Sequence, residues 1–511
     1  MRLAASGKPQ RIALCISVIA SVCALFLMML GANMGKELSH DEHMYVASGY
    51  LLGRDALLPY RDYPYLQMPY LTFVYALLFL LTDRILLVAR LFSTVCSSLL
   101  VVVLFWAAHG MGWRGYRLLT VGLGGAVLLI ANPVFIYTSG LAWNHDFPVL
   151  LSALALIVYC RALQREDRGK WVAVAGALLG IAVGARLIFA LLLIPFLLVA
   201  LFYPGLGAWK TRLHSVTSFL TGIIIALLPA LLMFALSGER FVWGNLGYHQ
   251  LNELYRRQTG HTQMMALESK LAYLRDVLTE PGTLILLLLA AILLPANLRR
   301  MRIEPSRYAG FALAISLVPF AVVGALIPTP TWYQYYYAPV PLLVLGAIYG
   351  LVPHSAPKKP DWRLGLFLVA VIASGVGGLS GYLRVGLLST ENWVPIKTHR
   401  TGEEIKGRVP GGKVLTLAPI FPLEGGVGIY EELAAGPFTW RSATLLPAGE
   451  REQLGIVSER ELGDLLASDP PAGILVGYEA DLEGPLVRYA QDHGFVPLDL
   501  VEGKMLWVAR R

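Results

Sequence analysis

The sequence predicts a mostly α-helical protein that crosses a membrane about eleven times and ends in a small α/β domain. Three observations lead to this prediction. Of the 511 residues, 56% are hydrophobic and only 15% are charged, whereas soluble domains carry roughly 25% charged residues. Apolar runs long enough to span a bilayer recur through residues 1–383. The charge also divides, with a net +15 over residues 1–400 and a net −7 over residues 401–511.

This composition excludes several classes of protein. The shortage of charge argues against an ordinary cytosolic enzyme and against a disordered chain. Nucleic-acid binding is not indicated, because the Lys and Arg residues lie between apolar runs rather than along one stripe. The cysteines lie in or at the ends of apolar runs, with no spacing typical of a metal site or a disulfide framework. We therefore expect plain apolar helix positions for Cys15, Cys23, Cys96 and Cys160.

Each predicted span is one apolar run. The run over 171–203 is too long for a single crossing of roughly 20 residues, so it is divided near Arg186. The first run follows basic residues but offers no clear small-residue cleavage site, which favours an uncleaved anchor over a signal peptide. The spans are expected at residues 12–33, 85–108, 117–137, 147–163, 171–186, 187–203, 215–236, 282–298, 308–327, 335–352 and 363–383.

The run at residues 69–82 is short for a crossing and is expected to lie in the membrane interface. The predicted inner segments then contain 18 Lys and Arg residues, and the short outer loops 138–146 and 328–334 contain none. If this run crossed, every later loop would change sides and contradict the positive-inside rule. We therefore expect a multi-pass protein of the cell membrane with a cytoplasmic N-terminus. The segments expected outside are the loops 34–84 and 237–281 and the tail from residue 384.

The tail, residues 384–511, has the pattern of a soluble α/β domain. It contains no nucleophile elbow, P-loop or dinucleotide-binding fingerprint. Strands are expected at 413–418, 473–477 and 505–509, and helices at 459–468 and 486–493.

Two acidic residues, Asp41 and Glu42, follow the first span at the predicted outer face of the membrane. A carboxylate there could act as a general base toward a hydroxyl group while the membrane holds a lipid-linked donor beside it. Both acids could equally cap an interfacial helix, because negative charge stabilises a helix N-terminus. His40 and His43 have i,i+3 spacing, so a metal site is possible but is the less favoured interpretation.

A second polar cluster, His145 and Asp146, lies in the short loop before the span at 147–163, on the same predicted face as Asp41. Two acidic loops facing one cavity would suit a catalytic site. The alternative is again a helix cap, because Pro148 suits a first helical turn.

Positive charge in the outer loop 237–281 departs from the positive-inside trend. Arg256 and Arg257 could hold a phosphate through bidentate contacts. Arg186 falls at the break between two apolar helices, where a charge is by default a functional candidate, although it could simply cap the carbonyl groups of the broken helix. A cluster of aromatic residues at 332–339 is best explained as an interface belt, and a groove for a sugar or a carrier lipid is the alternative.

Several short motifs follow one another along the chain. They are the Asp41-Glu42 pair, Gly53 with Pro59-Tyr-Arg-Asp62, Pro69-Tyr-Leu71, Val88-Ala-Arg-Leu-Phe-Ser93, Asp146, the segment 180–186 and the segment 335–341. Taken in this order, they resemble the GT-C membrane glycosyltransferases, and among them the protein O-mannosyltransferase, aminoarabinose transferase and lipopolysaccharide-core Rgt-like group. The resemblance covers the chain to about residue 383, and the tail resembles the small extracytoplasmic domain of many such proteins.

The resemblance implies an inverting transfer, on the outer face, of a sugar from a polyprenyl-phosphate-linked donor to an acceptor hydroxyl. It implies that Asp41 is the general base and that Glu42 and Asp146 orient the acceptor or the sugar. Basic groups would stabilise the departing phosphate. The expected partners are the donor, a glycan, lipid or protein acceptor, and membrane lipid, with no nucleic acid. No cofactor is certain, although a divalent metal such as Mg or Mn is possible.

The predicted site is therefore a large set of side chains grouped by role. The donor phosphate is assigned to Arg61, Arg186, Arg256 and Arg257. The substrate-lining residues are expected to be His43, Tyr45, Tyr60, Tyr65, His145, His249 and Tyr333.

The chain departs from the family pattern at one place. Relatives often have His-Pro-Pro or Glu-Lys-Pro-Pro before the interfacial helix, whereas this chain has Leu66-Gln-Met-Pro-Tyr70 and lacks the basic group. Arg61 or the 237–281 loop could replace it. Two rival functions stay open. A transporter or lipid flippase would need ionisable residues within spans and an internal repeat. The other rival is an inactive GT-C-like protein that serves only assembly.

Overall fold

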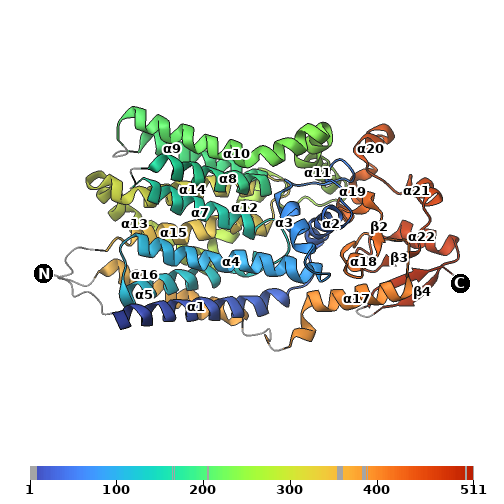
Figure 1. The fold of residues 1–511 in the computed structure, drawn as a ribbon, viewed down its shortest axis with the longest axis horizontal. Coiled ribbons are helices and arrows are strands. Elements are labelled where there is room, and N and C mark those ends of the chain that lie inside the picture. Colours follow the sequence, from blue (N-terminus) through green and yellow to red (C-terminus); the bar gives the residue numbers. More distant parts are fainter. Residues whose placement is uncertain are drawn as a thin grey trace.

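The computed structural model describes residues 8–163, 165, 167–203, 207–353, 361–382, 387, 389–500 and 503–509. Long helices run side by side in a bundle, and a smaller α/β unit covers one end of it (Figure 1). The N-terminal end of the first helix lies at the far end of the bundle, whereas the last described strand lies in the α/β unit. The first and last described elements are therefore at opposite ends of the molecule.

Helices occupy all eleven predicted spans, so the prediction of a polytopic helical fold is confirmed. Within the described residues, seven helices are long and apolar enough to cross a membrane, and the others in the set are shorter. The bundle helices are α1 (Lys8–Met34), α4 (Ile85–Gly110), α5 (Gly115–Ile130), α7 (Asp146–Ala162), α8 (Arg168–Ala185), η1 (Leu187–Leu192) with α9 (Leu193–Phe202), α10 (Trp209–Val242), α13 (Pro281–Ile303), α14 (Pro305–Leu326), α15 (Pro339–Gly350) and α16 (Trp362–Gly378) followed by η4 (Leu379–Tyr382).

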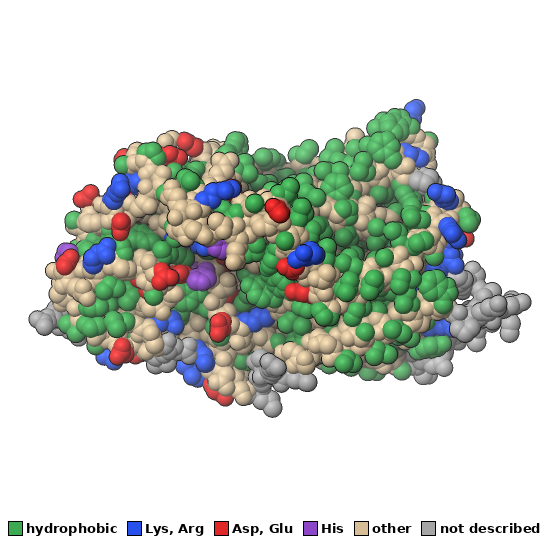
Figure 2. All heavy atoms as spheres, turned by 180° about the vertical axis from the view of Figure 1, so that it is seen from behind, with side chains coloured by type: hydrophobic (Ala, Val, Ile, Leu, Met, Phe, Trp, Pro, Cys, Tyr) green, Lys and Arg blue, Asp and Glu red, His purple; other side chains and the backbone are tan. Residues whose placement is uncertain are grey.

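The outward faces of these helices are apolar, as lipid contact requires. Ile225 on α10 is 60% exposed and Val376 on α16 is 82% exposed, and hydrophobic side chains cover most of the bundle surface in Figure 2. Inside the bundle, α8 and α10 approach closely at glycines. A Cβ atom on Gly176 would lie 2.1 Å from the carbonyl oxygen of Phe219, and one on Gly222 would lie 1.9 Å from that of Ala173. Small residues allow such contact between membrane helices.

Two predicted spans are shorter in the structure than in the prediction. The run 117–137 does not form one helix, because α5 ends at Ile130 and a separate helix, α6 (Pro133–Thr138), follows. The side chain of Asn132 caps α6 by accepting from the backbone N–H of Val134 at 3.0 Å, and Pro133 occupies the first turn. The span expected at 335–352 begins with a 3₁₀ turn, η3 (Tyr333–Tyr337), before α15.

Four helices lie in the two long loops expected outside the membrane, 34–84 and 237–281: α2 (His40–Arg54), α3 (Tyr70–Phe79), α11 (Tyr248–Gln258) and α12 (Leu267–Thr279). A single π-helical turn, η2 (Trp243–Gly247), joins α10 to α11. In Figure 1, α2, α3 and α11 lie at the end of the bundle that faces the α/β unit.

The α/β unit is built on a five-stranded sheet in the order β2-β1-β3-β5-β4. Strand β1 is parallel to β2 and β3, whereas β5 is antiparallel to β3 and β4. Every strand and helix predicted in the tail is present, and two short strands and several short helices are added. The elements are η5 (Thr390–Asn392), α17 (Val394–Arg408), β1 (Lys413–Leu415), α18 (Ile420–Glu424), β2 (Gly428–Ile429), η6 (Glu431–Leu433), α19 (Pro437–Ala443), α20 (Ala448–Leu454), α21 (Leu462–Ser468), β3 (Gly473–Val476), α22 (Gly484–Asp492), β4 (Val496–Asp499) and β5 (Met505–Val508).

Hydrogen bonds fix the α/β unit to the end of the bundle. The buried carboxylate of Glu424 on α18 accepts from the backbone N–H of Leu86, at the start of α4, at 2.7 Å. The hydroxyl group of Tyr478 donates to the carbonyl of Leu38, just before α2, at 2.7 Å. The unit therefore contacts the segment that carries Asp41.

Candidate functional site

A cavity of about 520 Å³ lies between the end of the bundle and the α/β unit. We call it the polar cavity; Asp41, His145, Arg186, Arg256, Arg441 and Glu479 are among its lining residues. A second cavity of about 490 Å³, the apolar groove, runs along η1 and the start of α11, with Leu187, Ile188, Leu191 and Leu246 in its walls. The two cavities share Gln67, Arg186, His249 and Tyr335. In Figure 2, histidine side chains are visible where the apolar bundle surface meets the more charged domain surface.

Asp41 stands in the first turn of α2 and lines the polar cavity. No group in the described part of the chain donates a hydrogen bond to its carboxylate. Burial raises the pKa of Asp41, and the positive charges of Arg441, His40 and Arg186 partly oppose that rise. A carboxylate with free lone pairs and a raised pKa is suited to accept a proton from a bound molecule.

Glu42, the next residue, is fully buried and does not line the polar cavity. Arg90 on α4 donates two hydrogen bonds to it, from Nε to Oε1 at 2.8 Å and from Nη2 to Oε2 at 2.7 Å. The backbone N–H groups of Ser39 and Ala142 donate to it as well, at 2.9 and 2.7 Å. Glu42 therefore joins α2 to α4 and to the loop before α7.

Asp146 has a similar environment at the start of α7. It is fully buried, accepts from the backbone N–H of Gly140 at 2.7 Å and accepts from the Tyr337 hydroxyl at 2.5 Å. It holds the 139–146 loop in shape but does not line the polar cavity. Of the three carboxylates predicted to be catalytic, the structure places only Asp41 on that cavity.

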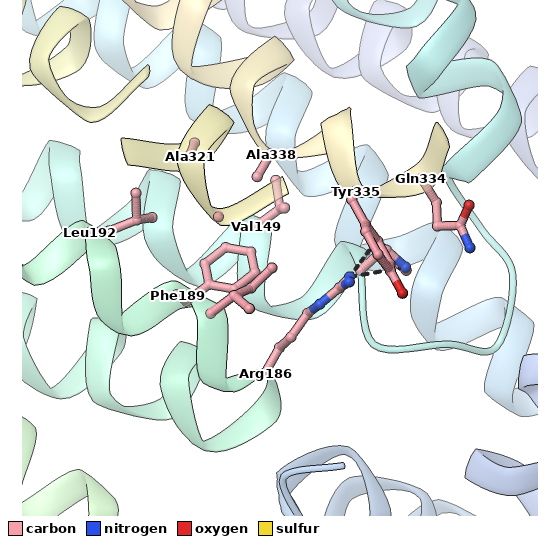
Figure 3. Close-up of a pocket in the computed structure, with 11 residues that line it drawn as sticks. Val149, Arg186, Phe189, Leu192, Ala321, Gln334, Tyr335 and Ala338 are labelled. Carbon is pink, nitrogen blue, oxygen red and sulfur yellow. Dashed lines mark hydrogen bonds between the residues drawn. The ribbon is translucent and has the colours of Figure 1, made fainter. Parts of the chain in front are cut away.

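Arg186 stands at the predicted break, with an extended backbone (φ −157°, ψ 116°) between α8 and η1. Its Nη1 lies 2.7 Å from Nδ1 and 3.0 Å from Nε2 of His145, and its Cζ lies 4.7 Å from the centre of the Tyr335 ring (Figure 3). Its backbone N–H donates to the carbonyl of Ala182 at 2.9 Å, but among the described residues no carboxylate forms an ion pair with its guanidinium and no backbone carbonyl accepts from it. The side chain of Arg186 therefore does not cap the carbonyl groups of α8.

The other three arginines predicted to bind phosphate divide into two groups. Arg256 lines the polar cavity, 5.7 Å from the centre of the Trp332 ring. Arg61 instead forms an ion pair on the surface, with its Nη2 2.8 Å from Oδ2 of Asp62. Arg257 forms another, with its Nη2 2.6 Å from Oε1 of Glu253.

The predicted substrate-lining residues also divide. Those on the polar cavity are Tyr45, His145 and His249. The others pack elsewhere. The ring centres of His43 and Tyr478 are 4.6 Å apart, and those of Tyr60 and Tyr65 are 5.5 Å apart. The Tyr333 hydroxyl donates to the carboxylate of Glu280 at 2.5 Å.

His40 and His43, the two candidate metal ligands, do not come together at one site. His40 pairs through Nδ1 with Glu479, and that hydrogen bond raises the pKa of His40. The His43 ring packs between Phe421 and Tyr478, away from the polar cavity. Within the residues that the structure describes, no three His, Cys, Asp or Glu side chains are placed to hold an ion. The divalent metal that we considered possible therefore has no assembled set of ligands among the described residues.

Sequence analysis missed residues that reach the polar cavity from the α/β unit. Arg441 on α19 donates from Nη2 to the Tyr248 hydroxyl at 3.2 Å and to Oδ1 of Asn252 at 2.8 Å. Glu479 and Asp481 line the same cavity from the loop after β3. No local signal marks them, because only the docking of the unit onto α2 and α11 brings them there.

Two residues of the aromatic cluster, Trp332 and Tyr335, line the polar cavity. This position supports the groove alternative, whereas the interface belt was the favoured interpretation. Tyr335 takes the place expected for Tyr333, because the 3₁₀ turn η3 decides which of these neighbours faces inward.

Comparison with known proteins identifies the fold. No protein-family model matches the chain, and none of the curated proteins matches its sequence significantly. ArnT from Cupriavidus metallidurans bound to undecaprenyl phosphate is similar over 97% of this chain and 98% of its own, with a TM-score of 0.62 and 15% identity. The Archaeoglobus fulgidus oligosaccharyltransferase AglB, in complex with an inhibitory peptide and a dolichol-phosphate, matches over 96% of this chain and 74% of its own, with a TM-score of 0.52 and 10% identity. Both are GT-C glycosyltransferases, so the predicted GT-C architecture is confirmed at the level of the fold.

Proposed function

We propose that this protein, which has the GT-C fold, is a membrane glycosyltransferase that moves a sugar from a polyprenyl-phosphate-linked donor to an acceptor hydroxyl. One observation carries the proposal most directly. The apolar groove meets the polar cavity at Arg186, a guanidinium with no carboxylate partner among the described residues. A lipid phosphate is the ligand that needs an apolar path ending at a positive charge.

The groove is chemically suited to a polyprenyl chain. Its walls carry Leu187, Ile188 and Leu191 on η1 and Leu246 on η2, which would contact isoprene units. The similar structures agree with this assignment, because the ArnT structure is bound to undecaprenyl phosphate and the AglB complex contains a dolichol-phosphate.

Asp41 is the proposed general base. It would take the proton of the acceptor hydroxyl while that oxygen forms a bond to the anomeric carbon of the donor sugar. The bond from the anomeric carbon to the carrier phosphate breaks on the opposite face, which inverts the configuration. Arg186 would stabilise the charge of the departing phosphate through charge-assisted hydrogen bonds. Glu42 and Asp146 would act only by positioning, since their oxygens are already engaged.

The proposed orientation places this chemistry on the outer side of the cell membrane. Basic residues of the predicted inner segments, such as Arg114, Arg212 and Arg300, lie at or beside the ends of α5, α10 and α13 that are remote from the α/β unit. Applied to this arrangement, the positive-inside rule puts the N-terminus in the cytoplasm. It puts the polar cavity and the domain formed by residues 384–511 outside, with residues 1–383 as the membrane domain.

Binding of undecaprenyl phosphate to the protein in lipid nanodiscs tests the proposal. Arg186→Gln should weaken binding by about 10- to 100-fold, the value of a charge-assisted hydrogen bond. Arg61→Gln is the matched control, because Arg61 pairs with Asp62 outside both cavities, and its affinity should equal that of the wild type. Equal binding by both variants would contradict the assignment of the groove.

Two further readouts separate the rival functions. A glycosyltransferase transfers labelled sugar from a polyprenyl-phosphate donor to a hydroxyl acceptor, and this transfer should disappear in Asp41→Asn. A flippase would move the lipid between leaflets without forming a product. An assembly protein would do neither.

A further inference from the structure

We propose that Arg256 and Arg441 form a second anion-binding subsite, which holds a phosphate or carboxylate group carried by the acceptor. This inference rests on the proposed function and names its acceptor class, a molecule with an anionic group close to the attacked hydroxyl. The two arginines come from distant parts of the chain, Arg256 from α11 and Arg441 from α19 of the α/β unit, and both line the polar cavity.

Arg441 is held firmly but keeps donors free. Its Nη2 is engaged by Tyr248 and Asn252, and its Cζ lies 4.8 Å from the centre of the Phe438 ring. Its Nε is buried and has no hydrogen-bond partner. Arginine presents its donors as a planar fork that matches carboxylate and phosphate oxygens. Within the described residues the Nη1 of Arg441 makes no hydrogen bond, and its side chain lines the polar cavity, so this end of the guanidinium is available to such a group.

Arg256 supplies a second guanidinium on the same cavity. Its Nε is also buried without a partner, and in the part of the chain that the structure describes no carboxylate pairs with it. Its neighbour Arg257 behaves differently, because it faces the surface and pairs with Glu253. Arg441 also lies within electrostatic reach of Arg256, so an anion in the polar cavity would be attracted by both guanidinium groups and accept from their terminal nitrogens.

The position of this pair favours the acceptor over the carrier. Arg186 lines the apolar groove, whereas Arg256 and Arg441 line only the polar cavity. Asp41 lies within electrostatic reach of both Arg186 and Arg441. In an inverting transfer the hydroxyl and the leaving phosphate are on opposite faces of the sugar, so basic groups near Asp41 that do not line the carrier groove are the ones expected to contact the acceptor. The acidic residues nearby do not oppose an anion strongly, since Glu479 pairs with His40 and Asp481 is exposed.

The test uses simple anions as probes. The protein is placed in phosphatidylcholine nanodiscs with saturating undecaprenyl phosphate and titrated calorimetrically with glucose 6-phosphate, glucuronate and glucose. We expect saturable binding of one or both anions and none of glucose; which anion binds more tightly distinguishes a phosphate acceptor from a carboxylate acceptor. Arg441→Gln and Arg256→Gln should each weaken anion binding by about 10-fold or more.

The controls separate this subsite from the carrier site. Arg257→Gln should bind the anions as the wild type does. Arg441→Lys, which keeps the charge but loses the fork, should give intermediate affinity, and thermal unfolding reports whether each variant is folded. No anion binding by the wild type would overturn the proposal, as would unchanged binding by both folded glutamine variants. Loss of undecaprenyl phosphate binding in Arg441→Gln would also overturn it, by assigning Arg441 to the carrier. If the wild type binds anions but never undecaprenyl phosphate, the proposed function fails and the subsite stands.

Discussion

Two neighbouring regions of this molecule differ in whether their charged side chains are paired. In the first region, Glu42, Arg90 and Asp146 are fully buried, and each makes short hydrogen bonds to its partners. Around Asp41, Arg186 and Arg441, in the polar cavity, the described residues provide no ion pair to any of the three. The first region ties α2, α4 and α7 together. The second keeps donors and acceptors available for a ligand.

The difference shows why proximity in sequence is a poor guide to role. Asp41 and Glu42 are adjacent, yet one faces the cavity and the other faces Arg90. Buried charges are tolerated only when they are paired or when function requires them. Satisfaction of hydrogen bonds, rather than residue type, therefore separates framework residues from candidate catalytic residues here.

The largest expected effect comes from breaking the framework region. Glu42→Ala leaves Arg90 buried without its carboxylate, which should cost about 3–5 kcal/mol of folding stability. Thermal unfolding in nanodiscs measures this loss. Asp41→Asn, one residue away, is the matched comparison and should unfold at or above the wild-type temperature, because it removes a buried carboxylate that has no hydrogen-bond donor. A wild-type midpoint for Glu42→Ala would show that the pair does not hold the fold.

The next effect concerns catalysis in the cavity region. Asp41→Asn should lower sugar transfer by about 10²- to 10⁴-fold, the usual contribution of a general base. The assay follows labelled sugar from a polyprenyl-phosphate donor, with folded protein quantified in parallel. Asp62→Asn serves as the control, because Asp62 pairs with Arg61 outside the polar cavity. Full activity of Asp41→Asn would remove Asp41 from the proposed mechanism.

A smaller effect is expected from narrowing the apolar groove. Ala190 on η1 lines the groove, so Ala190→Trp should raise the Kd for undecaprenyl phosphate by about 10-fold through overpacking. Leu198→Trp on α9 is the control, because Leu198 is 46% exposed and does not line the groove. Equal affinities for the two variants would place the lipid chain elsewhere.

The smallest effect tests electrostatics between the two sides of the cavity. Asp41 must be ionised to act as a base, so kcat should rise with pH through its pKa. Arg441 holds that pKa down against the effect of burial. Arg441→Gln should therefore raise the pKa and move the acid limb of the kcat profile to higher pH, by about one unit or less. Measurement at saturating acceptor isolates this shift from weaker binding, and Arg257→Gln should leave the profile unchanged.

Local patterns in the sequence determined most of the architecture. The apolar runs located the helices of the bundle, the change of composition near residue 400 located the α/β unit, and the single charge in the 171–203 run located the break at Arg186. These features depend on the free energy of transferring short segments from water to lipid, and that free energy is nearly additive along the chain. That is why they could be predicted without tertiary structure.

Tertiary structure decided which side chains meet in the cavity. Asp41, Arg256 and Tyr335 line the polar cavity, whereas their neighbours Glu42, Arg257 and Tyr333 do not. Which neighbour lines the cavity depends on how a helix or turn is rotated against partners from distant segments. Tertiary structure also brought Arg441 from the α/β unit to α11. Such contacts follow from hydrogen bonds between docked elements, such as Arg90 with Glu42 and Glu424 with Leu86, and short windows of sequence contain no record of which elements will dock.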